Sequence, residues 1–496
     1  MTSYLKIENP GVCPPEGFTL LGASNSRGNN DFIGKFGTGN KHGINVCLRN
    51  NANPIIYSSN LCLNFFTKPT PFQNKTIHKL FVKINGKDEF GKSINRTDDL
   101  NRVTEFGEED WPNIELGLRE FVSNALDGAL YQALLNENIN WCNQQNIPND
   151  TRKNLPENIW ESLSIHLKDF ANSVDYWNHV KIEIVAENKV RAKSGCTRVF
   201  VPMNNDVFKF FNHIDQWFLH FQNPELLRKN LLPKQNPKST AKIYKKGVFV
   251  RNWNSSDHPS LFDYNINELK IDECRTANDW ECRYYSALAL ANSNADNIEK
   301  FVESLQGDNL FWEHEFEPYG LTNVKANQLT IWMNAFNKIT NNKGVISKGT
   351  HADAVQRKGY QPIKVNDGVY QLLEKAGAKR TIDVLSNNEL LQRTIQPPSQ
   401  NILNAFHKIY QKLHELNLTQ HKPVPNVFQF TSNMNSGSTT FGFQENDAIF
   451  INSVLDGKSI ELDKVILEEI AHYLTDALDE TRDLQDWAFL VAAKLL

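Results

Sequence analysis

Three polar residues at helical spacing are the part of this sequence best suited to chemistry. Glu120, Asn124 and Asp127 follow at intervals of four and three residues in a strongly helical stretch, which places their side chains on one helix face. A carboxylate one turn from a carboxamide suits nucleotide hydrolysis, because the carboxylate can polarise water and the amide oxygen can hold a magnesium ion. A solvated helix face would show the same pattern, so the triad alone leaves both interpretations open.

A glycine-rich segment is the second candidate. Residues 34–41 read Gly-Lys-Phe-Gly-Thr-Gly-Asn-Lys. Glycines let backbone N–H groups approach phosphates, a following helix N-terminus adds a favourable dipole, and Lys41 can add a positive charge. The spacing matches neither the dinucleotide fingerprint nor the P-loop. An ordinary glycine-rich turn between strands is the alternative.

Length and composition limit the class of protein. With 496 residues, two or three domains are expected, and 40% hydrophobic and 22% charged residues are typical of globular proteins. A net charge of −4 argues against a strongly basic surface overall but leaves room for local patches, so nucleic acid is not indicated. No membrane-length apolar run or secretory signal is present, so we expect a cytoplasmic protein without membrane contact. The seven cysteines form no C-x-x-C pair and are expected to be reduced thiols.

Strand and helix patterns indicate which elements position the motifs. The first hundred residues alternate glycine-rich turns with short apolar runs, and a helix is predicted over 114–136, continued by a polar helical insertion to about 175. A turn at Lys245–Gly247 predicts a hairpin. Strands are predicted at 44–49, 54–57, 61–66, 80–84, 180–185, 197–201 and 243–250.

The second half of the chain reads differently. From about 280 the pattern favours longer helices, and the Pro-Pro-Ser-Gln segment at 397–400 indicates a boundary. Three domains are predicted, at residues 1–280, 281–395 and 396–496. The middle one is expected to be helical and mixed. Helices are predicted at 281–291, 329–339, 369–376, 401–416 and from about 462, with a mixed region at 358–365 and strands at 427–431 and 440–451.

Together, the triad and the glycine segment resemble the motifs of the GHKL (Bergerat-fold) ATPases, which include DNA gyrase, heat-shock chaperones, mismatch-repair ATPases and sensor histidine kinases. The triad looks like their N box, residues 33–41 look like their second glycine box, and residues 20–27 resemble the lid segment before it. The resemblance covers about residues 8–130. It implies an α+β fold class with a Bergerat-type sandwich, in which helices cover one face of a mixed sheet that also includes the strands at 180–201 and 243–250.

Two departures from the family pattern stand out. The N box follows the glycine box by about eighty residues instead of preceding it, which implies a circular permutation. The first glycine box, D-x-G-x-G in the family, has residues 8–12 as its candidate. There Glu8 keeps the acceptor that an adenine amino group requires, and Pro10 replaces a glycine.

The resemblance also implies roles for individual residues. Glu120 would be the general base, Asn124 the Mg²⁺ ligand, and Asp127 would organise the site beneath the nucleotide. Lys245 or Lys246 would read a phosphate. The residues expected to bind the nucleotide from the glycine box are Gly34, Lys35, Phe36, Gly37, Thr38, Gly39, Asn40 and Lys41.

The cluster from Asp272 to Arg275 has a more ordinary interpretation. Neighbouring charges of opposite sign at this spacing favour a salt bridge that caps a helix.

The last hundred residues contain a second motif. Residues 465–479 resemble the zincin helix with its H-E-x-x-H pattern, but Glu468 stands in place of the first histidine, while Glu469 and His472 keep their positions. We therefore expect a degenerate α+β zincin-like domain without zinc, used for packing or partner binding. A mixed ligand set of Glu468, His472 and Asp479 is the alternative, and an exposed amphipathic helix would look much the same.

The resemblance implies an ATP-binding, Mg²⁺-dependent ATPase that acts as a nucleotide-gated conformational switch, with homodimerisation and an unidentified protein client. Two alternatives stay open. One is an ATP sensor or scaffold without turnover, and the other is a metal-dependent hydrolase centred on the final helix.

Overall fold

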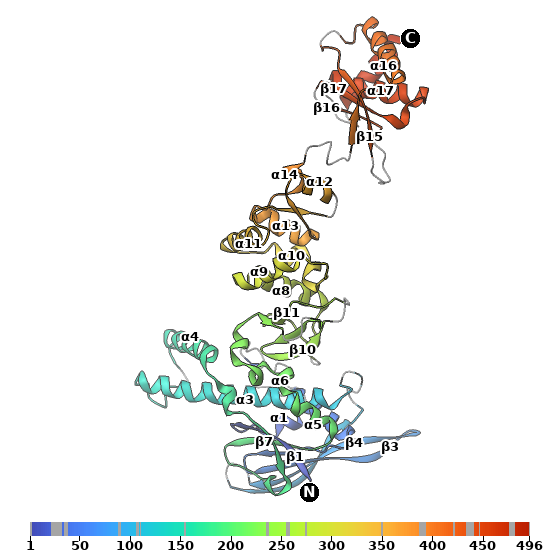
Figure 1. Ribbon diagram of the computed structural model, residues 1–496. Helices are drawn as coiled ribbons and strands as arrows, with labels where there is room; N and C mark the ends of the chain where they lie inside the picture. Colours follow the sequence, from blue (N-terminus) through green and yellow to red (C-terminus); the bar gives the residue numbers. More distant parts are fainter. Residues whose placement is uncertain are drawn as a thin grey trace. The chain divides into compact units, whose positions relative to one another are not determined.

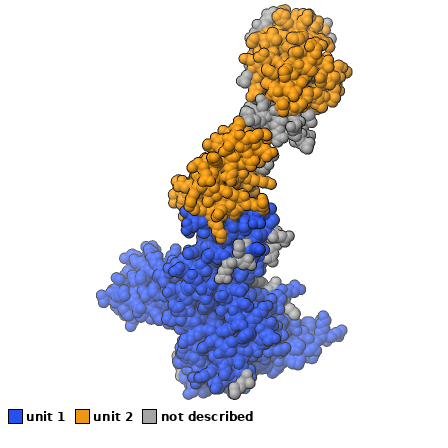
Figure 2. Space-filling view, viewed as in Figure 1, with its two compact units in different colours: residues 1–297, 309–324 blue, residues 298–308, 325–496 orange. Residues whose placement is uncertain are grey.

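The chain forms two compact units in a computed structural model, and each unit is described by itself. The first comprises residues 1–297 and 309–324, and the second comprises residues 298–308 and 325–496 (Figure 2). The fold class is mixed α+β with several sheets, as predicted. The structure describes residues 2–20, 32–33, 38–87, 91–105, 109, 111–152, 155–234, 238–253, 258–272, 275–348, 351–385, 393–419, 422–432, 441–445, 447–475 and 482–495.

A seven-stranded sheet is the base of the first unit, in the order β5-β4-β3-β2-β7-β1-β6. Its strands follow the alternation of the sequence: in β3, Leu61, Leu63 and Phe65 are buried, whereas the residues between them are half-buried. Neighbouring strands are antiparallel throughout, so the expected mixed sheet is wrong for these strands; β1 runs against both β6 and β7. The strands are β1 (Ser3–Pro10), β2 (Ile55–Ser58), β3 (Leu61–Phe72), β4 (Lys75–Lys87), β5 (Ser93–Val103), β6 (Lys181–Ala186) and β7 (Cys196–Pro202).

Two helices, α2 (Gly39–Arg49) and α3 (Ile114–Gln144), share the main core with this sheet. Figure 1 shows α3 beside the strands of the sheet. Their apolar side chains cluster with Leu5 and Ile7 of β1. The strand predicted at 44–49 is wrong, because these residues form most of α2. Since this short run is almost wholly buried, its apolar pattern does not distinguish a helix from a strand.

A glycine pair brings α2 and α3 close together. A Cβ atom added to Gly43 would lie 3.0 Å from the carbonyl oxygen of Gly117, and one added to Gly117 would lie 3.2 Å from the Cα of Gly43. The two helix backbones therefore approach without intervening side chains. This contact places the first turn of α2 beside Glu120 and Asn124 of α3.

The rest of the first unit includes a helix on α3 and a second sheet. The predicted helical insertion is present as the end of α3 and α4 (Glu157–Ser173), which contact each other. The predicted hairpin is confirmed, with Lys246 and Gly247 at φ 50° and 74° in its turn. Its strands belong to a separate sheet, so assigning 243–250 to the first sheet was wrong. This sheet has the order β10-β9-β11-β8, with β8 (Leu231–Pro233), β9 (Lys242–Lys245), β10 (Val248–Asn252) and β11 (Phe262–Asn265).

Helices predominate in the second unit, as predicted. A parallel pair, β12 (Gly344–Ser347) and β13 (Gln361–Lys364), is followed by a second sheet in the order β14-β15-β17-β16. The strands of that sheet are β14 (Arg393–Gln396), β15 (Asn426–Ser432), β16 (Gly442–Glu445) and β17 (Ala448–Asn452). The main helices are α11 (Ala326–Ile339), α13 (Asp367–Ala376), α16 (Gln400–Glu415), α17 (Ser459–Thr475) and α18 (Arg482–Leu495). The domain boundaries predicted at 281 and 396 stay predictions.

Candidate functional site

One cavity of the first unit, about 290 Å³ in volume, brings the two sequence motifs together. It lies among the end of β1, the start of α2, one face of α3 and the loop around residue 272. The predicted residues that line it are Thr38, Gly39, Asn40, Lys41, Glu120, Asn124 and Asp127. Gly34, Lys35, Phe36 and Gly37, like most of the lid segment 20–27, lie outside the described residues.

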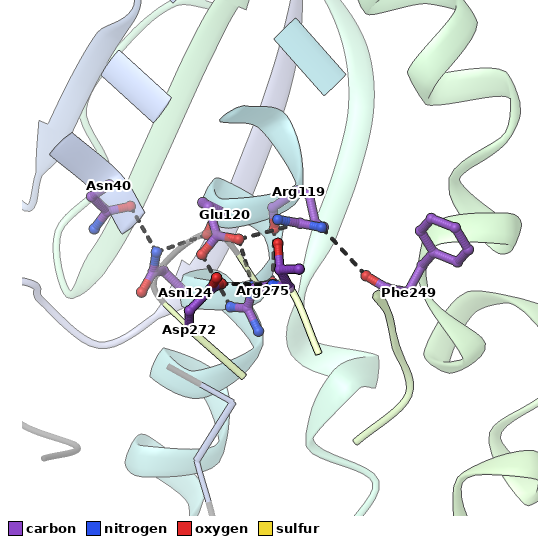
Figure 3. Close-up of polar contacts among 9 residues, drawn as sticks. Asn40, Arg119, Glu120, Asn124, Phe249, Asp272 and Arg275 are labelled. Carbon is purple, nitrogen blue, oxygen red and sulfur yellow. Dashed lines mark hydrogen bonds and ion pairs between the residues drawn. The ribbon is translucent and has the colours of Figure 1, made fainter. Parts of the chain in front are cut away.

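Asn124 joins the two motifs directly. Its Nδ2 donates to the Oδ1 of Asn40 at 2.9 Å and to the backbone carbonyl of Glu120 at 2.7 Å (Figure 3). Both bonds use the amide nitrogen, so the amide oxygen is the atom that can face a cation in the cavity.

Asp127 holds the chain that leads into the glycine segment. Its Oδ1 accepts a hydrogen bond from the backbone N–H of Ile33 at 2.7 Å. The next residue, Gly128, allows β1 to approach, since a Cβ atom there would lie 2.4 Å from the Nδ2 of Asn9. This arrangement suits the organising role implied for Asp127.

Glu120 is buried and paired with arginine. Arg275 binds its carboxylate through two nitrogens, with Nε–Oε1 at 2.5 Å and Nη2–Oε2 at 3.0 Å, and the Nε of Arg119 lies 3.3 Å from Oε1 (Figure 3). Burial acts to raise the pKa of the Glu120 carboxyl, but the two guanidinium groups outweigh it and lower that pKa. The carboxylate is therefore ionised, and it is a weak proton acceptor while Arg275 stays bound.

Arg275 is a site residue that the sequence interpretation missed. It lies in a turn closed by Ile271 and Ala277, at φ 59°, and its N–H donates to the carbonyl of Asp272 at 3.1 Å. The predicted helix-capping role is wrong, because Asn278 caps the following helix, α8 (Asp279–Ala291). Glu120 and Arg275 are 155 residues apart, and charge spacing along the chain carries no signal for such a contact.

The same carboxylate leaves no room for a side chain at Gly39. A Cβ atom at this position would lie 2.6 Å from the Oε2 of Glu120. The ion pair with Arg275 holds that oxygen in place, so only glycine lets α2 begin this close to Glu120.

Two buried cations lie at or near the cavity. Burial, and less strongly the charge of Arg102, lowers the pKa of Lys41 to about 8, against an opposing effect of Cys13. Burial also lowers the pKa of Arg102 to about 10, and no acceptor among the described residues bonds its Nε or Nη1. Two cations that influence each other in a buried site favour the binding of an anion.

Glu8 does not line the cavity, whereas its neighbours Ile7 and Asn9 do. Successive residues of a strand face opposite sides, and the Glu8 carboxylate pairs with Lys193 at 2.6 Å and Arg198 at 2.9 Å. Burial acts to raise the pKa of Glu8, but these cations and Lys6 lower it to about 2. The position of Glu8 therefore does not fit the predicted adenine-reading role, whereas its neighbour Asn9 lines the cavity.

Asn9 and Gly11 both line the cavity at the end of β1. Thr197 of β7, also missed, fixes the turn after Asn9: its Oγ1 donates to the carbonyl of Gly11 at 3.0 Å and accepts from the N–H of Cys13 at 2.9 Å.

The two lysines of the hairpin turn do not line the cavity. The Nζ of Lys245 donates to the carbonyls of Asn267, at 2.7 Å, and Leu269. The Nζ of Lys246 donates to the carbonyl of Phe32 at 2.8 Å. The structure therefore does not place either lysine as a phosphate reader.

The zincin-like motif lies only partly within the described residues. On α17, Glu468 is exposed, Glu469 is buried and His472 is half-buried, and Asp479 lies outside the described residues. Within the described ranges, no group of three or more histidine, cysteine, aspartate or glutamate residues is placed to hold a metal ion.

Comparisons with known proteins add no relative. No protein-family model, curated protein or solved structure matches the chain. Over the part of the chain that the structure describes, no helix has both the length and the apolar character needed to cross a membrane.

Proposed function

We propose that the first unit binds ATP with Mg²⁺ in this cavity and hydrolyses it, as a circularly permuted Bergerat-type domain. The observation that carries the proposal is the meeting of Asn40 with Asn124 and of Gly39 with Glu120. Motifs about eighty residues apart in the sequence thus contribute to one cavity. A chance match on a solvated helix would have no reason to meet a glycine-rich helix start.

The charges of the cavity suit a nucleotide with its phosphates toward α2. The N-terminus of this helix offers backbone N–H groups and a positive dipole, and Lys41 adds a full charge. Arg102 has two donors that no described acceptor bonds, and its charge acts on Lys41, so it adds to the positive potential. Adenine would lie toward Asn9, whose carboxamide can both donate and accept.

Hydrolysis would use Glu120 as the base. The amide oxygen of Asn124 would hold Mg²⁺, which offsets phosphate charge. A water oxygen attacks the γ-phosphorus, its proton passes to the Glu120 carboxylate, and the bond to the β–γ bridging oxygen breaks to give ADP and phosphate.

Proton transfer to Glu120 requires that Arg275 first leaves its ion pair with this carboxylate. Arg275 lines the same cavity, so the triphosphate and Glu120 would compete for its guanidinium. Once Arg275 moves to the phosphate, the pKa of Glu120 rises and the carboxylate can accept a proton. The same ion pair favours a second candidate, an ATP sensor with negligible turnover, in which Arg275 never leaves Glu120.

Nucleotide binding and phosphate release test the proposal. We expect the full chain to bind ATP in the presence of Mg²⁺ by calorimetry and to release phosphate at a rate that saturates with ATP. Binding without release, unchanged by Glu120→Ala, would support the sensor instead. Absence of ATP binding at millimolar concentration would overturn both.

A further inference from the structure

A long hairpin in the first unit carries a feature that nucleotide binding does not use. β3 and β4 pair over twelve residues each, from Leu61 opposite Gly86 to Phe72 opposite Lys75. Only residues 61–64 of β3 also pair with β2. On the other side, β4 pairs with β5 at Lys79 and over residues 81–87, so residues 69–78 at the tip of the hairpin extend beyond the pairing with both described neighbouring strands (Figure 1). We call residues 65–82 and the adjoining lysines at 83 and 87 the hairpin arm.

A row of lysines occupies one face of the arm. Strand alternation places Lys75, Lys79, Lys83 and Lys87 on the same face of β4, and Lys68 of β3 lies opposite Lys79. The other face carries the buried residues of the core, such as Leu80, Val82 and Ile84. At about 3.3 Å per residue, successive lysines lie roughly 13 Å apart and the row is roughly 40 Å long.

Most lysines of the row have no ion-pair partner among the described residues. Lys79 pairs with Asp99 at 2.6 Å, whereas Lys75, Lys83 and Lys87 are exposed and form no ion pair with any described carboxylate. Residues 61–103, which span β3, β4 and β5, contain eight lysines and arginines, including the buried Arg102, against four aspartates and glutamates. Their net charge is +4 in a chain of net −4, so this part of the sheet is more positive than the chain as a whole.

Aromatic rings accompany the lysines. Phe66 and Phe81 stack with centroids 5.8 Å apart, and the Nζ of Lys68 lies 4.6 Å from the Phe81 centroid. At the tip, the Phe72 side chain is 58% exposed and follows the exposed Pro71. An exposed Phe-Pro pair on a basic hairpin is a suitable wedge for a nucleic-acid groove.

Two other occupants fit less well. Pro69 and Pro71 lack N–H donors on the outer part of β3, where no described strand pairs beyond β4, which disfavours the addition of a peptide strand. A lipid surface favours an element with an exposed apolar face opposite its charges, but here that face is in the core.

We propose that the lysine face of the hairpin arm binds the backbone of a duplex nucleic acid, with Phe72 contacting a groove. A row of roughly 40 Å matches about one helical turn of the duplex, roughly 34–36 Å. Lysines bind phosphates without reading sequence, so the binding is salt-dependent and sequence-independent. This inference does not depend on ATP binding.

The test is fluorescence anisotropy of a labelled 30-base-pair DNA duplex of mixed sequence with the full chain, without nucleotide, from 50 to 200 mM salt. We expect the logarithm of the binding constant to fall linearly with the logarithm of the salt concentration, with a slope of about −0.9 for each phosphate contact. K75E/K83E/K87E should lose at least about tenfold in affinity and flatten the slope. Phe72→Ala should weaken binding by a few fold without changing the slope.

A control variant with the same change in net charge tests whether the position of the lysines matters. K168E/K209E/K364E reverses three exposed lysines outside the arm and should stay within about threefold of the unaltered protein. Circular dichroism checks that each variant is folded, and the milder pair K83A/K87A repeats the test if the triple variant is not. The proposal is overturned if the unaltered protein does not bind the duplex at 50 mM salt, or if control and arm variants lose affinity equally. Tighter binding to phosphatidylserine vesicles than to duplex, lost in K75E/K83E/K87E, would also overturn it.

Discussion

Helices α3 and α17 both carry a motif of polar residues at helical spacing, but they differ in what the described residues place beside the motif. On α3, Glu120 and Asn124 meet Arg275 and the first turn of α2. On α17, the residues of the altered zincin pattern have no third metal-ligating group beside them in the described ranges. Spacing along a helix predicts which side chains share a face, whereas function depends on what the fold brings to that face.

The largest expected effect is on phosphate release. Glu120→Gln removes the proton acceptor but keeps the side-chain shape, so phosphate release should fall by about 100-fold or more. Glu468→Gln, the corresponding change on α17, should leave release unchanged. Equal rates for Glu120→Gln and the unaltered protein in a phosphate-release assay would remove the catalytic distinction between the two helices.

Loss of the buried ion pair should reduce stability. Arg275→Ala leaves Glu120 buried without its two-nitrogen partner, at a cost of about 3–5 kcal/mol in the free energy of unfolding at pH 7, measured with urea. Arg380→Ala removes a half-buried arginine that pairs with Glu374 and Asp383 near the surface, and it should change stability little.

The Arg275→Ala effect should depend on pH. Arginine lowers the folded-state pKa of Glu120, so the ion pair stabilises the fold above the unfolded pKa, about 4.3, and this stabilisation is lost as pH falls through the folded value. The difference between the variant and the unaltered protein should therefore shrink in acid. A difference independent of pH would contradict the assigned ion pair.

Two crowded glycines give a matched comparison. A Cβ atom added to Gly39 would lie 2.6 Å from a carboxylate oxygen of Glu120. One added to Gly442 would lie 2.6 Å from a carboxylate oxygen of Glu469. Alanine at either position should destabilise its own region by about 1–3 kcal/mol through overpacking. Calorimetry should show weaker ATP binding for Gly39→Ala alone, and equal ATP affinity in both variants would contradict the assignment of the cavity.

The smallest expected effect is a difference in ATP binding between variants of Asn9 and Glu8, which are neighbours on β1. Asn9→Ala removes one hydrogen-bonding group from the cavity and should weaken ATP binding by roughly two- to tenfold. Glu8→Gln should leave ATP binding unchanged, because its carboxylate pairs with Lys193 and Arg198 outside the cavity. The reverse order of effects would restore the adenine role to Glu8.

Glu8→Gln should instead change the response to acid. The folded pKa of Glu8 is about 2, below the unfolded value, so its contribution is fully present above about pH 4.5 and is lost as pH falls toward 2. The glutamine variant should lose less stability over that range.

The sequence predicted the elements with clear periodicity and missed contacts that depend on the fold. Alternation identified most strands of the first sheet, and spacing identified the face of α3 that lines the cavity. The helix at 44–49 was missed because its apolar residues are buried on several sides. The side of the sheet that Asn9 faces is set by strand register, which the sequence did not reveal. The contact of Arg275 with Glu120 joins residues 155 positions apart in the chain, and local patterns do not predict such a contact.

A crystal structure of the full chain with Mg²⁺ and a non-hydrolysable ATP analogue tests the central claim most directly. We predict that the phosphates lie at the start of α2 beside Lys41, that Asn124 faces Mg²⁺, and that Arg275 has moved from Glu120 to the γ-phosphate. An analogue bound elsewhere, or a cavity without nucleotide at saturating concentration and with Arg275 still on Glu120, would contradict the account.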